Sequence, residues 1–193
     1  MYNLKSIVLL SLSASLLLAA PTKNKELQQV EKIGHKSSKL LLFTLGKNMK
    51  KHMKKGGALD ALNFCSNEAY SLTQQVNTKL PKGVQVKRIS LRYRSPANVA
   101  SEQERAVLES LETLKDAGVI LPQNIVQKTG EHTYKFYKPL FISKPVCLKC
   151  HGDVQNTQLK NAILEKYPLD KAMGYNLGDL RGAIVVDIDK SAK

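Results

Sequence analysis

Hydrophobic residues at spacings of three and four dominate the first third of the chain and predict helices there. The pattern covers residues 24–55 and stops at Gly56 and Gly57. It resumes over residues 58–77, where the apolar positions are Leu59, Leu62, Cys65, Ala69, Leu72 and Val76. We therefore expect two consecutive helices, with Cys65 on the inward face of the second.

Roughly alternating apolar and polar residues predict strands later in the chain. The expected strands cover residues 84–94, 132–142 and 181–187, and they are rich in β-branched and aromatic residues. A helix over residues 101–115, opened by a Ser-x-x-Glu capping box, separates the first two strands. Residues 121–128 give no clear prediction. Strands separated by helices indicate a mixed α+β domain with a largely antiparallel sheet.

Length and composition fit one globular domain behind a short leader. The chain has 193 residues, of which 42% are apolar and 24% charged. Residues 1–20 combine Lys5, a nearly continuous apolar run and a terminal Ala-Ala pair, which is typical of a secretory signal. The run is shorter than the roughly 20 residues of a spanning helix. We expect a periplasmic domain over residues 21–193 that keeps no membrane span.

The chain is strongly basic, with 30 Lys and Arg against 16 Asp and Glu and a formal net charge of +14. Such a charge favours acidic partners or anionic surfaces. The export signal and the lack of a nucleic-acid-binding motif disfavour nucleic acid. The first expected helix ends in a lysine-rich turn that contains Lys47, Lys50, Lys51, Lys54 and Lys55. This turn is either a solvated face that complements the helix dipole or a docking patch.

The most specific motif is at residues 147–151, which read Cys-Leu-Lys-Cys-His. In this haem c attachment pattern, the thiols of Cys147 and Cys150 add to the haem vinyl groups and His151 becomes an iron ligand. We therefore expect one covalent haem c as the cofactor.

Two other readings of the Cys-x-x-Cys pair remain open but are less favoured. A structural zinc site would need two more ligands at comparable spacing, and the sequence has no second cysteine pair. A redox disulfide of the thioredoxin type would lie at the start of a helix in a βαβ unit, whereas Gly152 and Asp153 follow the motif directly. Either alternative predicts a colourless protein.

Cys65 is the third cysteine and has no evident disulfide partner. It is either a small buried hydrophobe or a thiolate ligand on the far side of the iron. Other residues that could take that position are His35, His52, His132, Met49, Met53 and Met173. Spacing alone does not choose between Cys65 and this group.

Several stretches together resemble a family of single-haem c-type proteins with a PAS-like fold, long classed as a domain of unknown function. The matching stretches are residues 64–69 (FCSNEA), 86–98 (VKRISLRYRSPAN), 136–140 (FYKPL), 147–152 (CLKCHG), 167–170 (YPLD), 174–175 (GY) and 178–183 (GDLRGA). The family is represented by a cyanobacterial protein encoded beside a photosystem gene and includes extracytoplasmic sensor domains. The resemblance implies a PAS-like sheet flanked by helices, thioethers at Cys147 and Cys150, and axial ligands at His151 and Cys65.

Three arginines are candidates to bind the haem propionates. Arg92, Arg94 and Arg181 lie in or beside expected strands, and guanidinium groups form charge-assisted bonds to carboxylates. The competing reading is that they are basic residues on the solvated face of a strand.

Two functions follow from these expectations. The first is redox or gas sensing, in which loss of a Cys65 ligand changes the protein's shape and a separate signalling protein receives the signal. The alternative is a periplasmic electron-transfer cytochrome whose basic surface meets an acidic redox partner. An enzyme is not expected, because the sequence offers no recognisable acid-base set beside the iron.

Overall fold

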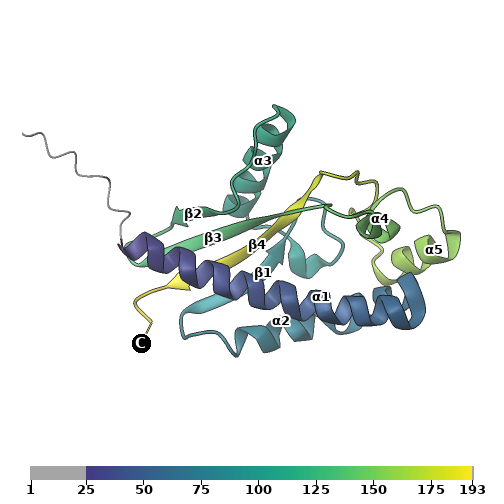
Figure 1. Ribbon diagram of the computed structural model, residues 1–193, viewed down its shortest axis with the longest axis horizontal. Helices are drawn as coiled ribbons and strands as arrows, with labels where there is room; N and C mark the ends of the chain where they lie inside the picture. The colour runs from purple at the N-terminus through teal and green to yellow at the C-terminus, as the bar shows by residue number, and fades with distance from the viewer. Residues whose placement is uncertain (1–24, 193) are drawn as a thin grey trace, which may run out of the picture.

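Four antiparallel strands form one sheet in the order β1-β4-β3-β2 (Figure 1). The computed structural model describes residues 25–192, so the predicted leader, residues 1–20, lies outside the described residues. The elements in chain order are α1 (Lys25–Asn67), α2 (Ala69–Asn77), β1 (Val84–Ile89), the 3-10 turn η1 (Pro96–Asn98), α3 (Glu102–Asp116), β2 (Ile125–Lys128), β3 (Thr133–Phe141), α4 (Pro145–His151), α5 (Thr157–Lys166) and β4 (Leu180–Asp189). The α+β class is confirmed. Within residues 25–192, no helix is long and apolar enough to cross a membrane.

The helix α1 and the shorter α2 cover one face of the sheet (Figure 1). Neighbouring strands place Val86, Val186 and Phe136 in one cross-strand row on this face. The row packs with the buried Val30 and Leu41 of α1. This row explains the helical spacing of the first segment, because its apolar positions meet the sheet.

Gly34 lets α1 approach the sheet closely. A Cβ atom at this position would lie only 2.1 Å from the Cγ atom of Phe136. The Phe136 side chain is fully buried, so it has little room to move aside. The absence of a side chain at Gly34 is therefore required by packing.

Gly56 and Gly57 interrupt α1, as the sequence predicts. Both have non-helical backbone angles, and Gly57 has φ 69°. The expected helix over residues 58–77 is present but is broken by an irregular turn at Glu68, where α2 begins. Cys65 lies on the segment between these two interruptions.

The opposite face of the sheet packs against α3 around a buried carboxylate. Glu104 is 0% exposed and completes the predicted capping box with Ser101. Its carboxylate also accepts from Lys87 at 2.8 Å and from Lys135 at 2.9 Å. Burial opposes ionisation of Glu104, but these bonds outweigh it and lower its pKa to about 2.

The first strand is shorter than expected. The prediction of a strand over residues 84–94 is wrong beyond Ile89, where β1 ends. The chain then forms an isolated bridge between Ser90 and Val99, and Arg92 and Arg94 belong to the intervening loop. The reason is that both arginines bind the segment after α5 instead of continuing the ladder.

The connection between β3 and β4 builds one end of the molecule. It contains α4 and α5, which lie beyond the sheet near the end of α1 (Figure 1). The pairing of β3 with β4 shifts register between Leu140 and Phe141, just before this connection. The motif at residues 147–151 therefore lies at this end of the sheet.

Candidate functional site

The motif residues lie on one face of α4. This helix begins at Pro145, whose fixed φ suits the first helical position, and ends at Gly152. Because residues three and four apart share a helix face, Cys147, Cys150 and His151 point in similar directions. Both cysteines are free thiols. The α4 helix thus presents two thiols and an imidazole together, as haem c attachment requires.

His151 is held as a neutral imidazole by its surroundings. Its Nδ1 atom lies 2.8 Å from the carbonyl oxygen of Ala172, so this nitrogen carries the proton and donates it. Burial, together with the cations Arg181 and Arg94, lowers the pKa of His151 to about 3. Nε2 is then the unprotonated nitrogen, the form in which histidine binds a metal.

Cys65 approaches the motif from α1. Burial raises the pKa of its thiol, the nearby Arg88 lowers it, and the thiol of Cys150 raises it further. Cys150 is thus close enough to Cys65 to affect the ionisation of its thiol, although 85 residues of sequence separate them. Cys147 instead packs near Ile142 and Tyr175. The structure therefore brings Cys65 and the motif to the same end of the sheet.

Arg94 positions the motif helix. Its Nε donates to Oδ1 of Asp170 at 2.8 Å, and its Nη2 donates to the carbonyl oxygen of Cys150 at 2.7 Å. The Asp170 side chain is fully buried and also accepts from the backbone amide of Ala172. Arg94 thus links the end of α4 to the segment that carries the His151 acceptor.

Arg92 and Arg181 lie against the same aromatic ring. Their guanidinium carbons are 4.0 Å and 5.4 Å from the ring centroid of Tyr175. Arg92 donates to the carbonyl oxygens of Lys171 and Met173. Arg181 donates to Oγ of Ser90 and to a backbone carbonyl. Neither guanidinium pairs with a carboxylate among residues 25–192.

Arg88 is a site residue that the sequence analysis missed. In β1 it shares the α1-facing side of the sheet with Val84 and Val86. The Nε atom of Arg88 is buried and has no hydrogen-bond partner within the described part of the chain. Burial lowers the pKa of Arg88, and Cys65 and Tyr167 are the groups that oppose this effect. The sequence did contain a signal for this role, because Arg88 places a charge where the alternation of Val84 and Val86 predicts an apolar residue.

The charges at this end of the sheet do not balance. Arg88, Arg94 and Arg181 all lower the pKa of His151 by their positive charge. The buried carboxylate of Asp170 is paired with Arg94. Burial lowers the pKa of Arg181 as well as that of Arg88. Buried guanidinium groups without anions are costly. The two propionates of a haem are anions of the kind that this site lacks, so these residues fit the group.

The alternative iron ligands lie in other environments, with one exception. His52 binds Asp60 at 3.1 Å and stacks on Phe64, while His132 is exposed beside Glu131. His35 contacts the ring of Phe136, and Met49 is exposed. Met173, the exception, packs on the same apolar cluster as Cys150. Met53 is partly buried on α1.

A zinc site would need four ligands in close proximity. Residues 25–192 contain no cluster of three or more His, Cys, Asp or Glu side chains that could hold a metal ion.

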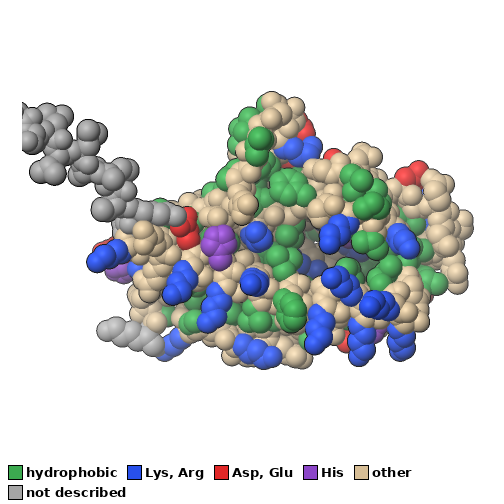
Figure 2. Space-filling view, in the orientation of Figure 1, with side chains coloured by type: hydrophobic (Ala, Val, Ile, Leu, Met, Phe, Trp, Pro, Cys, Tyr) green, Lys and Arg blue, Asp and Glu red, His purple; other side chains and the backbone are tan. Residues whose placement is uncertain are grey.

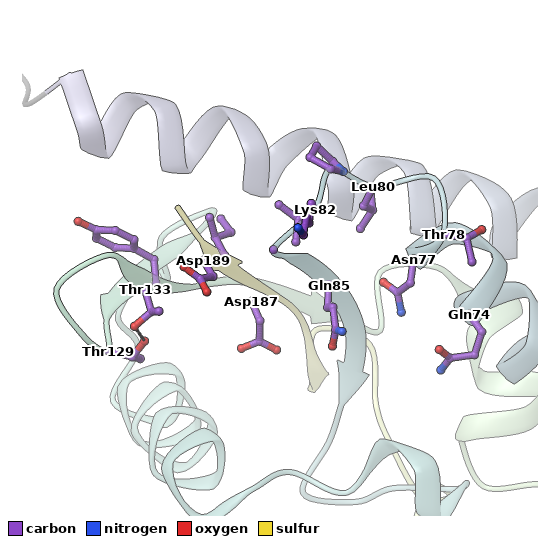
Figure 3. Close-up of a pocket in the computed structure, with 15 residues that line it drawn as sticks. Gln74, Asn77, Thr78, Leu80, Lys82, Gln85, Thr129, Thr133, Asp187 and Asp189 are labelled. Atoms are coloured by element: carbon purple, nitrogen blue, oxygen red, sulfur yellow. Dashed lines mark hydrogen bonds between the residues drawn. The ribbon is translucent and has the colours of Figure 1, made fainter. Parts of the chain in front are cut away.

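Two cavities differ in their relation to the motif. The larger, about 630 Å³, is at the other end of the sheet between α2, β1 and β4, and polar side chains such as Gln74 and Asp187 line it (Figure 3). The smaller, about 430 Å³, adjoins Gly56, Leu148 and Lys149. Figure 2 shows a hollow in the surface between α1 and α4. The α4 helix therefore contributes Leu148 and Lys149 to the smaller cavity, whereas Cys147, Cys150 and His151 line neither of the two.

The family model of the Tll0287-like proteins matches residues 19–189, so this chain belongs to that family. The crystal structure of the cyanobacterial haem protein Tll0287 matches with a TM-score of 0.59 and 22% sequence identity. The match covers 88% of this chain and 98% of that one, which supports the PAS-like α+β fold. The comparison with curated proteins gave no match.

Proposed function

We propose that this protein binds one haem c covalently through Cys147 and Cys150, and that His151 and Cys65 would supply the protein ligands of its iron. The observation that carries the proposal is the environment of His151. Its Nδ1 is hydrogen-bonded to the Ala172 carbonyl, which leaves Nε2 available for a metal, and the same helix face carries two free thiols. Membership of the Tll0287-like family adds support, because the structurally similar Tll0287 is a haem protein.

Each residue near the motif has a distinct task in this proposal. The Ala172 carbonyl fixes the tautomer and the ring orientation of His151. The Arg94–Asp170 pair holds α4 against the segment that supplies this carbonyl. When bound, the haem supplies one-electron redox chemistry and an iron centre for small ligands.

We assign the propionates to the guanidinium groups that lack a carboxylate partner. Arg181 and Arg88 meet this condition, and Arg92 lies beside Arg181 on the Tyr175 ring. Arg94 already has its carboxylate in Asp170. We therefore give Arg94 a positioning role, which changes the expectation from sequence that it binds a propionate directly.

Redox or gas sensing is the function that this arrangement favours. Cys65 lies on a short helical segment, residues 58–67, between the break at Gly56 and Gly57 and the irregular turn at Glu68. Breaks of this kind allow a segment to shift as a unit. Loss of the Cys65 ligand would then move this segment relative to the rest of α1. This role requires no catalytic residue, and we propose a periplasmic location.

Electron transfer is the second candidate. The observation that favours it is the excess of lysine over acidic residues, which would attract an acidic redox partner. Carbon monoxide separates the two functions. Rapid binding to the ferrous protein supports sensing, and no binding at saturation supports electron transfer.

The ligand assignment is tested by optical and low-temperature EPR spectra of wild type, Cys65→Ala and Met173→Leu. We expect a thiolate-like low-spin ferric signal that disappears in Cys65→Ala and persists in Met173→Leu. A low-spin signal without thiolate character that changes only in Met173→Leu would make Met173 the ligand. A signal unchanged in both variants would exclude both residues and return the assignment to the remaining histidines and methionines.

A further inference from the structure

A straight row of exposed residues follows the outer face of α1. Its members are Lys32, Lys36, Lys39, Phe43, Lys47, Lys50 and Lys54, here called the lysine stripe. Their spacings of four and three residues put them on one helix face. All seven are exposed, while the opposite face of α1 is buried against the sheet. At 1.5 Å per residue the stripe is roughly 33 Å long.

The lysine stripe carries uncompensated positive charge. The sequence has no Asp or Glu between Glu31 and Asp60. None of its six lysines forms an ion pair with another residue of the 25–192 range. Figure 2 shows Lys and Arg side chains following the length of α1 across this face. Repulsion within such a row is relieved when it meets an anionic surface.

Phe43 lies at the middle of the lysine stripe and is 66% exposed. The lysines at positions 39 and 47 flank it by one turn on each side, and Leu42 is also exposed. Helices that lie in a membrane interface combine lysines, which stay at the level of the headgroups, with Phe or Leu side chains, which enter the boundary between headgroups and acyl chains.

We propose that the lysine stripe docks α1 lengthwise on an anionic phospholipid bilayer. The helix α1 lies on the outside of the molecule over the sheet, so its outer face can lie along a flat surface. Its cations are all lysines, which act as flexible point charges, whereas the site arginines provide the planar groups suited to bidentate recognition. This inference does not depend on haem.

The test is sedimentation with vesicles, using the purified full-length protein with the same N-terminus in every variant. The vesicles are pure phosphatidylcholine or phosphatidylcholine with about 30% phosphatidylglycerol, at low salt. We expect selective binding to the anionic vesicles that weakens as salt screens the charges. Equal binding to both vesicle types, or binding to neither, would overturn the proposal.

A matched pair of variants separates the lysine stripe from net charge. Lys36→Glu/Lys39→Glu/Lys47→Glu changes the charge by the same amount as Lys79→Glu/Lys82→Glu/Lys160→Glu, which alters exposed lysines elsewhere. Since each lysine near an anionic bilayer contributes roughly five-fold to affinity, the first variant should lose about 100-fold or more. The second should lose less than about 10-fold. Equal losses would overturn the proposal.

Two further comparisons keep the result clear of folding effects. Thermal melting of every variant identifies any that unfolds. If a triple Glu variant unfolds, both triple variants are made again with Gln in place of Glu at the same positions. Phe43→Ala should weaken binding by roughly three-fold to ten-fold, while Leu164→Ala on α5 should leave it unchanged. Equal effects of these two substitutions would exclude insertion of Phe43 and overturn the interface docking.

Discussion

Arg94 and Asp170 form a buried ion pair that connects two segments 76 residues apart, with Nε and Oδ1 separated by 2.8 Å. The Asp170 side chain is 0% exposed and that of Arg94 is 9% exposed. Because Arg94 also donates to the carbonyl oxygen of Cys150, the pair fixes the motif helix as well as the loop beneath it. Its integrity therefore matters to the fold and to the site.

Asp170→Asn should lower the free energy of unfolding by about 3–5 kcal/mol, because it leaves the buried Arg94 guanidinium without its charge partner. Urea unfolding measures the change. Arg105→Ala is the matched control, since the Arg105–Glu109 pair is exposed with a 3.8 Å separation and should contribute less than about 0.5 kcal/mol. Similar losses in the two variants would contradict a special role for the buried pair.

Glu104 should make the protein acid-sensitive. Its pKa falls from an ordinary 4.5 to about 2 in the folded protein, so its stabilising effect is complete above pH 4.5 and is lost as the pH falls towards 2. The loss is on the order of 3 kcal/mol. Unfolding curves at several pH values measure it. Glu104→Gln should be less stable than wild type at pH 7, and its stability should change less between pH 4.5 and 2. An equally steep change with pH in Glu104→Gln would contradict the role given to Glu104.

Gly34→Ala should destabilise the protein by about 1–3 kcal/mol, because the added methyl group would overlap the buried Phe136 ring. Gly46→Ala provides a control within the same helix. A Cβ atom at Gly46 meets nothing within 4 Å, so the substitution should raise stability by roughly 0.5–1 kcal/mol. Thermal melting of both variants gives the comparison, and destabilisation by both would point to helix geometry and not to the Phe136 contact.

Arg88→Met should lower the reduction potential of the haem protein, because it removes a cation that favours the ferrous state. The expected shift is on the order of tens of millivolts. In the haem-free Cys147→Ala/Cys150→Ala background, Arg88→Met should be at least as stable as its parent, since it removes a buried nitrogen without a partner. Arg105→Met is the exposed control. An unchanged potential in Arg88→Met would place Arg88 outside the haem environment.

The long elements were predictable from sequence because each buries a continuous apolar face. Val30 and Leu41 belong to the periodic pattern of α1, and the break at Gly56 and Gly57 follows from the residue types themselves. The capping box of α3 was equally local. The two helices after β3 were missed, because α4 has only seven residues and α5 has only Leu159 and Ile163 as buried positions.

The motif was also predictable, but its supporting shell was not. Cys147, Cys150 and His151 share a local spacing that haem attachment requires. The partners of Arg94 and His151, in contrast, come from a loop distant in sequence, and no local pattern pairs Arg94 with Asp170. The end of β1 at Ile89 was missed for the same reason, since tertiary contacts of the arginines override the alternation.

Intact mass spectrometry under denaturing conditions tests the central claim most directly. The protein is produced in a host with cytochrome c maturation machinery, as wild type and as Cys147→Ala/Cys150→Ala. We predict that wild type carries the added mass of one haem and that the double variant carries none. Wild-type protein without this added mass, from a host that matures a control cytochrome c, would contradict covalent haem binding.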